Sequence, residues 1–213
     1  MDDITLNLIV IGCTALIAGG IFLLVNKKQK ESEQQLRQMA VQKGWQMETI
    51  RKPLVSGTRI KSTYWTIETI SQSSGQESGP GSSNIAQSTT WLAPRSGSII
   101  LVGPRPPQSN LGTMGALLSQ QVIQMALGPE ASNVKEVQVG SSEFQKRFMV
   151  WAQDEKDADR LLTPAVQADL LTWHKMIPLI KRTSADLRIE LRGFHLTKAA
   201  DFQRLVQLGE KLD

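Results

Sequence analysis

The sequence predicts an α+β protein. One N-terminal transmembrane helix precedes a cytoplasmic domain of antiparallel or mixed β-strands packed with about five helices. Three observations lead to this fold class. Residues 4–25 form a long apolar segment without a charged residue, the middle of the chain is rich in β-branched and turn residues, and the last third alternates strand-like with helix-like segments.

The apolar segment Ile4–Val25 is long enough to cross a bilayer as a helix. At about 1.5 Å per residue its length is roughly 33 Å, close to the ~30 Å hydrocarbon core. Two acidic residues precede it, and Lys27, Lys28 and Lys30 follow it. The positive-inside rule therefore predicts a single-pass protein of the inner (cytoplasmic) membrane, with its N-terminus outside and its C-terminal domain in the cytoplasm. A cleaved signal peptide fits less well, because such peptides begin with basic residues and have shorter apolar cores.

This topology divides the chain into three regions. We predict a transmembrane anchor at 1–26, a juxtamembrane stalk helix at 27–44 and an α+β domain at 45–213, which could divide into sub-lobes at 45–128 and 129–213. The stalk has a single short apolar stripe, which suits packing against its own domain better than a coiled coil.

The predicted strands are rich in β-branched and aromatic residues and are bounded by turn residues. They cover residues 45–52, 59–70, 85–92, 98–102, 134–139, 144–152 and 187–192. The last of them shows the clearest pattern, because Leu187, Ile189 and Leu191 alternate with three charged residues. Such alternation predicts a strand with one buried face.

Capping residues define the predicted helices. Asp154 can cap a short helix through Leu162, and Thr163 precedes a proline at the first position of the next helix. A third helix is expected over 198–212, with its apolar residues facing inward.

The helix predicted over 111–127 has an unusual composition. Its apolar residues recur every three or four positions, and they are Met114, Leu117, Leu118, Val122 and Met125. The other side carries Gln120 and Gln124 but no charge, and no Lys or Arg occurs from Pro106 to Asn133. An uncharged polar side is typical of an interface. We therefore predict partner binding at Gln120 and Gln124, with an ordinary half-buried helix as the alternative.

The anchor itself offers a second contact surface. Ala15 and Gly19 form a small-xxx-small pair, which permits close approach of another membrane helix. The segment holds no histidine, and no methionine after Met1, so we expect no haem or pigment ligand in it. The expected partners are the lipid bilayer and membrane protein subunits.

Catalytic and metal-binding residues are scarce. The one cysteine, Cys13, lies in the predicted anchor, and neither His174 nor His195 belongs to a known catalytic or metal-binding motif. The acidic group near Asp154 resembles a helix cap and a solvated surface more than a metal site. The modest net charge of +4 and the absence of basic–aromatic clusters argue against nucleic acid binding. We therefore predict no catalytic residues, no cofactor and no metal.

Five short sequence segments suggest a family. They are GW at 44–45, YWTIE at 64–68, FQKRFMVWAQD at 144–154, EKDADRLLTP at 155–164 and LRIELRG at 187–193. In this order they resemble bacterial membrane-anchored proteins that carry a domain of unknown function, over about residues 30–195. The resemblance implies no catalytic residues.

These observations favour a non-enzymatic accessory or structural subunit of a larger membrane protein complex, such as a respiratory or photosynthetic one. The alternative is a membrane-tethered sensor or ligand-binding module. It would need a pocket lined by Trp65, Trp91 or Trp151. An anchored enzyme would need a cleft that brings His174 or His195 to a carboxylate.

Overall fold

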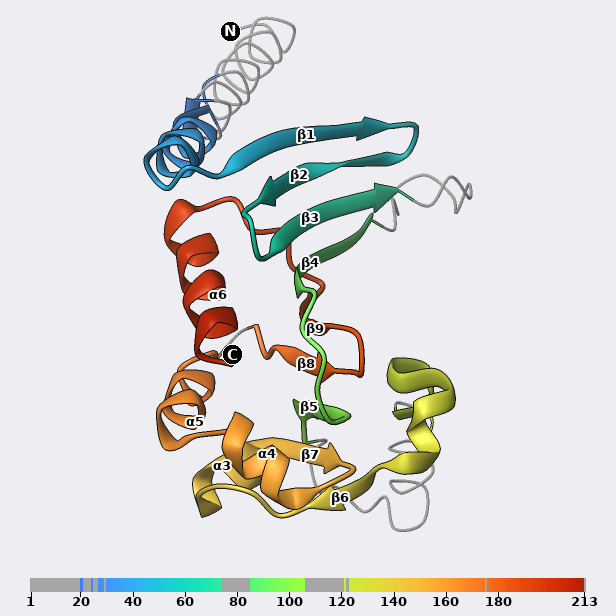
Figure 1. Cartoon of the computed structure of the whole chain (residues 1–213). Coiled ribbons are helices and arrows are strands. Elements are labelled where there is room, and N and C mark those ends of the chain that lie inside the picture. The colour runs from blue at the N-terminus through green and yellow to red at the C-terminus, as the bar shows by residue number, and fades with distance from the viewer. Residues whose placement is uncertain are drawn as a thin grey trace, which may run out of the picture.

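The molecule is built on one antiparallel sheet. The computed structural model describes residues 20, 24, 27, 28, 30–73, 85–105, 121, 123–174 and 176–212. Within these residues nine strands lie in the order β1-β2-β3-β4-β9-β8-β5-β7-β6, and the sheet twists strongly from β1 to β6 (Figure 1). Every pair of neighbouring strands is antiparallel.

The elements follow the chain in this order. The strands are β1 (Gln46–Lys52), β2 (Val55–Lys61), β3 (Thr66–Ser73), β4 (Ile85–Ala93), β5 (Ile100–Pro104), β6 (Lys135–Val137), β7 (Phe148–Ala152), β8 (Leu179–Arg182) and β9 (Leu187–Arg192). The helices with complete bounds are η1 (Gly128–Asn133), α3 (Ser142–Arg147), α4 (Glu155–Leu161), α5 (Pro164–Leu171) and α6 (Ala199–Lys211). Residues 30–42 and 123–127 are also helical.

Strands β1 to β4 follow one another as hairpins, whereas the rest of the sheet is assembled from distant segments. The segment predicted as one strand over 59–70 is in fact two strands, because a tight turn closes with the Ser62 N–H donating to the Trp65 carbonyl at 2.8 Å. Strand β4 pairs with β9 so that Trp91 lies opposite Ile189. Strand β5 then lies between β8 and β7, so strands from both predicted sub-lobes share one sheet.

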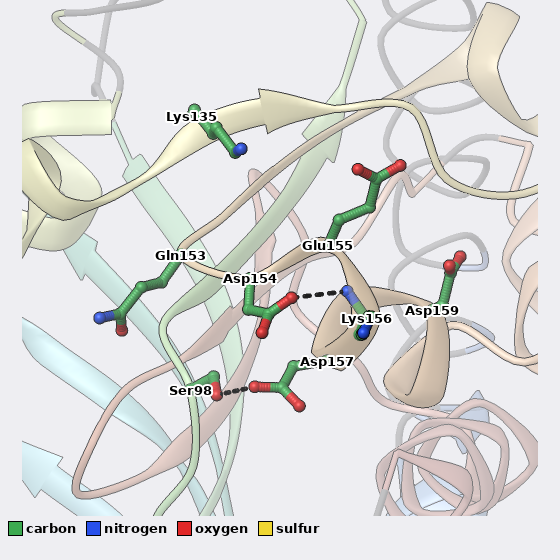
Figure 2. Close-up of a pocket in the computed structure, with 8 residues that line it drawn as sticks. All are labelled: Ser98, Lys135, Gln153, Asp154, Glu155, Lys156, Asp157 and Asp159. Atoms are coloured by element: carbon green, nitrogen blue, oxygen red, sulfur yellow. Dashed lines mark hydrogen bonds between the residues drawn. The ribbon is translucent and has the colours of Figure 1, made fainter.

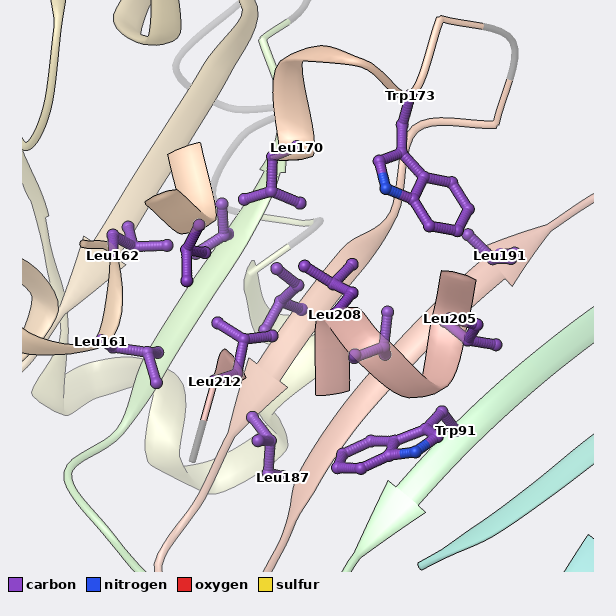
Figure 3. Close-up of a cluster of buried hydrophobic side chains, with 14 of the residues drawn as sticks. Trp91, Leu161, Leu162, Leu170, Trp173, Leu187, Leu191, Leu205, Leu208 and Leu212 are labelled. Carbon is purple, nitrogen blue, oxygen red and sulfur yellow. The ribbon is translucent and has the colours of Figure 1, made fainter. Parts of the chain in front are cut away.

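One face of the sheet is covered by α3, α4, α5 and α6, and the main core lies beneath them (Figure 1). Leucines of α6 point toward the sheet between Trp91 and Trp173, both of which are fully buried (Figure 3). Gly209 of α6 lies directly against the Trp91 ring, where a larger residue would not fit. Burial of this apolar surface is the main stabilising term, at about 25 cal/mol per Å².

A smaller cluster covers the opposite face of β5, β7 and β8. Its buried members are Ile99, Leu101, Ile123, Leu127, Met149, Trp151 and Leu179. The helical residues 123–127 and the start of η1 therefore lie on the side of the sheet away from α6 (Figure 1). Since side chains alternate across a strand, β5 contributes Leu101 to this cluster and its neighbours Ile100 and Val102 to the main core.

The N-terminal helix packs on its own domain. Leu36 and Ala40 are buried, Met39 is half-buried against the main core, and Ser32 donates a hydrogen bond to the Thr197 carbonyl at 2.7 Å. The helix ends at Gly44, whose φ of 69° is the left-handed conformation that commonly terminates helices. These contacts agree with the expectation that this helix packs against its own domain and not in a coiled coil.

The predicted membrane-anchored fold class is corrected. No helix in the part of the chain that the structure describes is both long and apolar enough to cross a bilayer. The expected span, residues 4–25, lies outside the described residues except for Gly20 and Leu24. The helix that is described, residues 30–42, is mostly polar and exposed apart from the side that packs on the domain. What the structure shows is an antiparallel nine-stranded sheet with helices on it, and the single-pass inner-membrane location is not supported.

Candidate functional site

A polar hollow lies where α4 meets the sheet. It has a volume of about 710 Å³. Eight residues line it, and they are Ser98, Lys135, Gln153, Asp154, Glu155, Lys156, Asp157 and Asp159 (Figure 2). Two lysines and four carboxylates line it, so the hollow carries a net negative charge, and its surface is mainly polar.

Local structure accounts for the central carboxylates of this hollow. Asp154 caps α4 and accepts a hydrogen bond from the Lys156 backbone N–H at 2.9 Å. Asp157 accepts a hydrogen bond from the Ser98 hydroxyl (Figure 2). It also pairs with Arg160 at 3.3 Å. No group of three or more His, Cys, Asp or Glu residues in the described ranges is arranged to hold a metal ion. The hollow is thus a helix-capping surface that tethers α4 to the segment before β5.

The two histidines lie in different settings, and neither bonds to a carboxylate among the described residues. His174 is exposed, and its Nδ1 lies 3.3 Å from an Arg147 guanidinium nitrogen. That arginine also donates to the Leu171 and Trp173 carbonyls, so it fixes the turn after α5. Helix α5 ends at Leu171, so His174 lies in the turn beyond it and does not pack on the apolar side of that helix.

His195 is half-buried and held in place. Its Nδ1 lies 2.9 Å from the Ser71 hydroxyl on β3. The buried Thr89 hydroxyl donates to the Phe194 carbonyl at 3.0 Å and accepts from the Leu196 N–H at 3.3 Å, which fixes the backbone on both sides of the ring. Burial lowers the pKa of His195, and a hydrogen bond to the Ile70 carbonyl opposes this shift. The ring is therefore a structural link between β3 and the segment that leads into α6.

The tryptophans proposed to line a ligand pocket are core residues. Trp65 and Trp91 are buried in the main core, whereas Trp151 is buried in the smaller cluster on the other face of the sheet. Trp65 packs edge-on against Trp45 with 4.8 Å between ring centroids. Because the sheet separates these rings, the three do not line a common pocket.

Charged residues cover the outer face of β1 to β3. Glu48 pairs with Lys61 at 3.0 Å and with Arg59 at 3.5 Å, and Arg59 also pairs with Glu68 at 2.5 Å. The hydrogen bond from Lys61 lowers the pKa of Glu48. The hydrogen bond to Glu68 raises the pKa of Arg59. These partly exposed pairs contribute little stability individually.

The described end of the uncharged segment, residues 121 and 123–127, has an exposed side. Ile123 and Leu127 are buried in the smaller cluster, whereas Gln121 and Gln124 are exposed and Met125 is 80% exposed. Met125 therefore lies on the exposed side, although its spacing groups it with the other apolar residues of this segment. The i,i+4 pair of Ile123 and Leu127 sets which side of the helix is buried. In the sequence, that pair was the feature that could have indicated the buried side.

The positions of the other predicted site residues are these. Gln124 is exposed, as a binding residue must be. Gln120, Ala15 and Gly19 lie outside the described residues. Lys27, Lys28 and Lys30 are exposed helical residues, and their role in membrane orientation stays a prediction.

Comparison with known proteins identifies one domain. Residues 89–192 match the family described as "Protein of unknown function (DUF3137)". This confirms the resemblance to a domain of unknown function over a shorter range than expected. The matched range runs from the second half of β4 to the end of β9, and it includes the residues of the hollow and the uncharged segment. No curated protein matches the chain. The mycobacterial trehalose monomycolate transport factor A, TtfA, gives a TM-score of 0.44 at 9% identity, over 84% of this chain and 91% of that chain. A likeness at this level carries no functional information.

Proposed function

We propose that the protein is a non-enzymatic accessory protein of a larger protein assembly, and that it binds a partner protein through the uncharged surface around Gln124 and Met125. The observation that carries this proposal is the 80% exposure of Met125 on a helix whose other side is anchored in the core. An exposed methionine among glutamines provides adaptable apolar contact without the desolvation cost of charge.

Two further features support the proposal. The sequence from 106 to 129 contains no charged residue, which is uncommon on a solvent-exposed surface and common at interface centres. The anchoring residues Ile123 and Leu127 pack against strands β5, β7 and β8, all of which lie in the range 89–192. A role shared by proteins with this domain would have to use residues in that range.

The test is co-purification of partner proteins with the full chain. The variant Gln124→Lys with Met125→Glu places two charges on the proposed surface, and both positions are exposed, so the fold should be retained. We expect it to lower recovery of the partner at least tenfold, because an interface centre tolerates unpaired charge poorly.

The matched control is Gln203→Lys with Gln207→Glu on the exposed side of α6, which adds the same charges elsewhere. It should recover the partner at the parental level. Equal recovery by both double variants would overturn the proposed surface and favour a ligand-binding module instead.

A further inference from the structure

The two edges of the sheet differ sharply. Strand β6 at one edge has three residues, a length typical of a protected edge. Strand β1 at the other edge has seven residues, and all of them pair with β2 without a bulge. No strand among the described residues pairs with the outer side of β1. It is therefore a long, regular edge that is able to accept another strand.

The turn after β1 determines which backbone groups face this edge. Lys52 and Val55 flank a two-residue turn, so they form a hydrogen-bonded pair. Hydrogen-bonded pairs alternate along an antiparallel ladder, which directs the N–H and C=O groups of Ile50 and Glu48 toward β2. Those of Met47, Thr49 and Arg51 point outward.

The side chains of β1 are arranged in a self-complementary order. On the outer face Glu48, Ile50 and Lys52 follow one another at two-residue spacing. Ile50 lies opposite Gly57, which has no side chain to cover it. Lys52 is exposed and forms no ion pair among the described residues, whereas Glu48 retains free acceptor positions beside Lys61.

We propose that β1 pairs with β1 of a second copy of this chain, antiparallel, about a two-fold axis at Ile50. In this register the two Ile50 side chains face each other, and Glu48 of each copy faces Lys52 of the other. These are non-hydrogen-bonded pairs, in which cross-strand side chains lie closest. Thr49 and Arg51 supply the backbone hydrogen bonds between the copies. The two sheets thus become one continuous sheet.

The neighbouring register, centred on Thr49, is less favourable. It would place Glu48 opposite Ile50 and Met47 opposite Arg51, so that charged side chains face apolar ones. Charge and apolar complementarity both favour the register centred on Ile50.

The first test measures the dissociation constant of the dimer of the full chain by light scattering and analytical ultracentrifugation. Lys52→Glu places two acids opposite each other and should raise the dissociation constant at least tenfold. Arg51→Glu makes the same charge change on the other face of the strand and should raise it less than threefold. Equal effects of the two variants, or a parent chain that is monomeric at every concentration, would overturn the proposal.

Backbone pairing is tested separately at Thr49. Because its N–H points away from β2, Thr49→Pro removes a donor at the edge without breaking the β1–β2 ladder. We expect Thr49→Pro to abolish the dimer and Thr49→Ala to retain it. A folded Thr49→Pro variant that still dimerises would show that β1 is not the interface.

The register is tested by oxidative cross-linking in a Cys13→Ser background. Ile50→Cys should form a disulfide-linked dimer, because the two cysteines would face each other at the axis. Thr49→Cys should not, because its counterpart is displaced along the strand. Cross-linking through position 49 but not through position 50 would overturn the proposed register.

Discussion

The contact between Gly209 and Trp91 gives the sharpest test of how α6 is docked. A Cβ atom at residue 209 would lie 2.5 and 2.8 Å from the Cζ2 and Cδ2 atoms of the Trp91 ring, well inside ordinary van der Waals contact. The ring is fully buried and cannot move aside, so overpacking should cost about 3 kcal/mol. Replacing glycine by alanine inside a helix would otherwise stabilise it by about 1 kcal/mol.

The two effects oppose each other, and the steric one is larger. Gly209→Ala should therefore lower the free energy of unfolding by about 2 kcal/mol, which corresponds to a Tm about 4–8 °C lower for a domain of this size. Thermal unfolding of the full chain followed by circular dichroism measures this shift. The control Gln207→Ala, at an exposed position of the same helix, should change Tm by less than about 2 °C. A Gly209→Ala variant that is as stable as the parent, or more stable, would refute the close packing of α6 on Trp91.

Four further substitutions test the sheet and the link to the start of α6. Ile189→Ala should cost about 2–5 kcal/mol because Ile189 is fully buried, and Glu190→Ala should cost well under about 1 kcal/mol; denaturant unfolding that gave equal losses would contradict the alternation of β9. Thr89→Val should cost about 1–3 kcal/mol by the same measurement, since it leaves two backbone groups beside residue 195 without their partner. The lowered pKa of His195 means that the unfolded chain binds a proton more readily, so stability is complete above the unfolded-state value of 6.5 and falls as the pH drops below it. His195→Asn should flatten this dependence between about pH 7.5 and 5, and an unchanged slope would assign it to other groups.

Local sequence signals predicted those elements whose pattern and caps agree. Leu187, Ile189 and Leu191 are buried on β9, as their alternation indicates. Asp154 and Thr163 cap α4 and α5, because a side-chain oxygen at the N-cap bonds the exposed N–H groups wherever the rest of the chain lies. These features depend only on neighbours within a few residues, so a sequence pattern is sufficient to reveal them.

Local signals failed where two short elements adjoin. The strand predicted over 144–152 begins only at Phe148, because Ser141 accepts a hydrogen bond from the Phe144 N–H and starts the short helix α3. Phe144 and Phe148 are stacked at 4.8 Å between centroids. A helix of six residues followed directly by a strand of five is too short on either side for periodicity to separate the two.

For the proposed binding surface around Gln124 and Met125, the sequence indicated only an uncharged segment containing Gln124. That Met125 is exposed depends on Ile123 and Leu127, which find their partners on β5, β7 and β8.

The sequence by itself determined the strand β9 and the capped helices α4 and α5, because short-range hydrogen bonds and side-chain periodicity depend only on nearby residues. Only the tertiary structure decided that β4 pairs with β9, that β5 lies between β8 and β7, and that β1 is left as a long edge. Strand order depends on which apolar faces can be buried together across the whole chain. Any one strand is compatible with many neighbours, so no single segment contains that information.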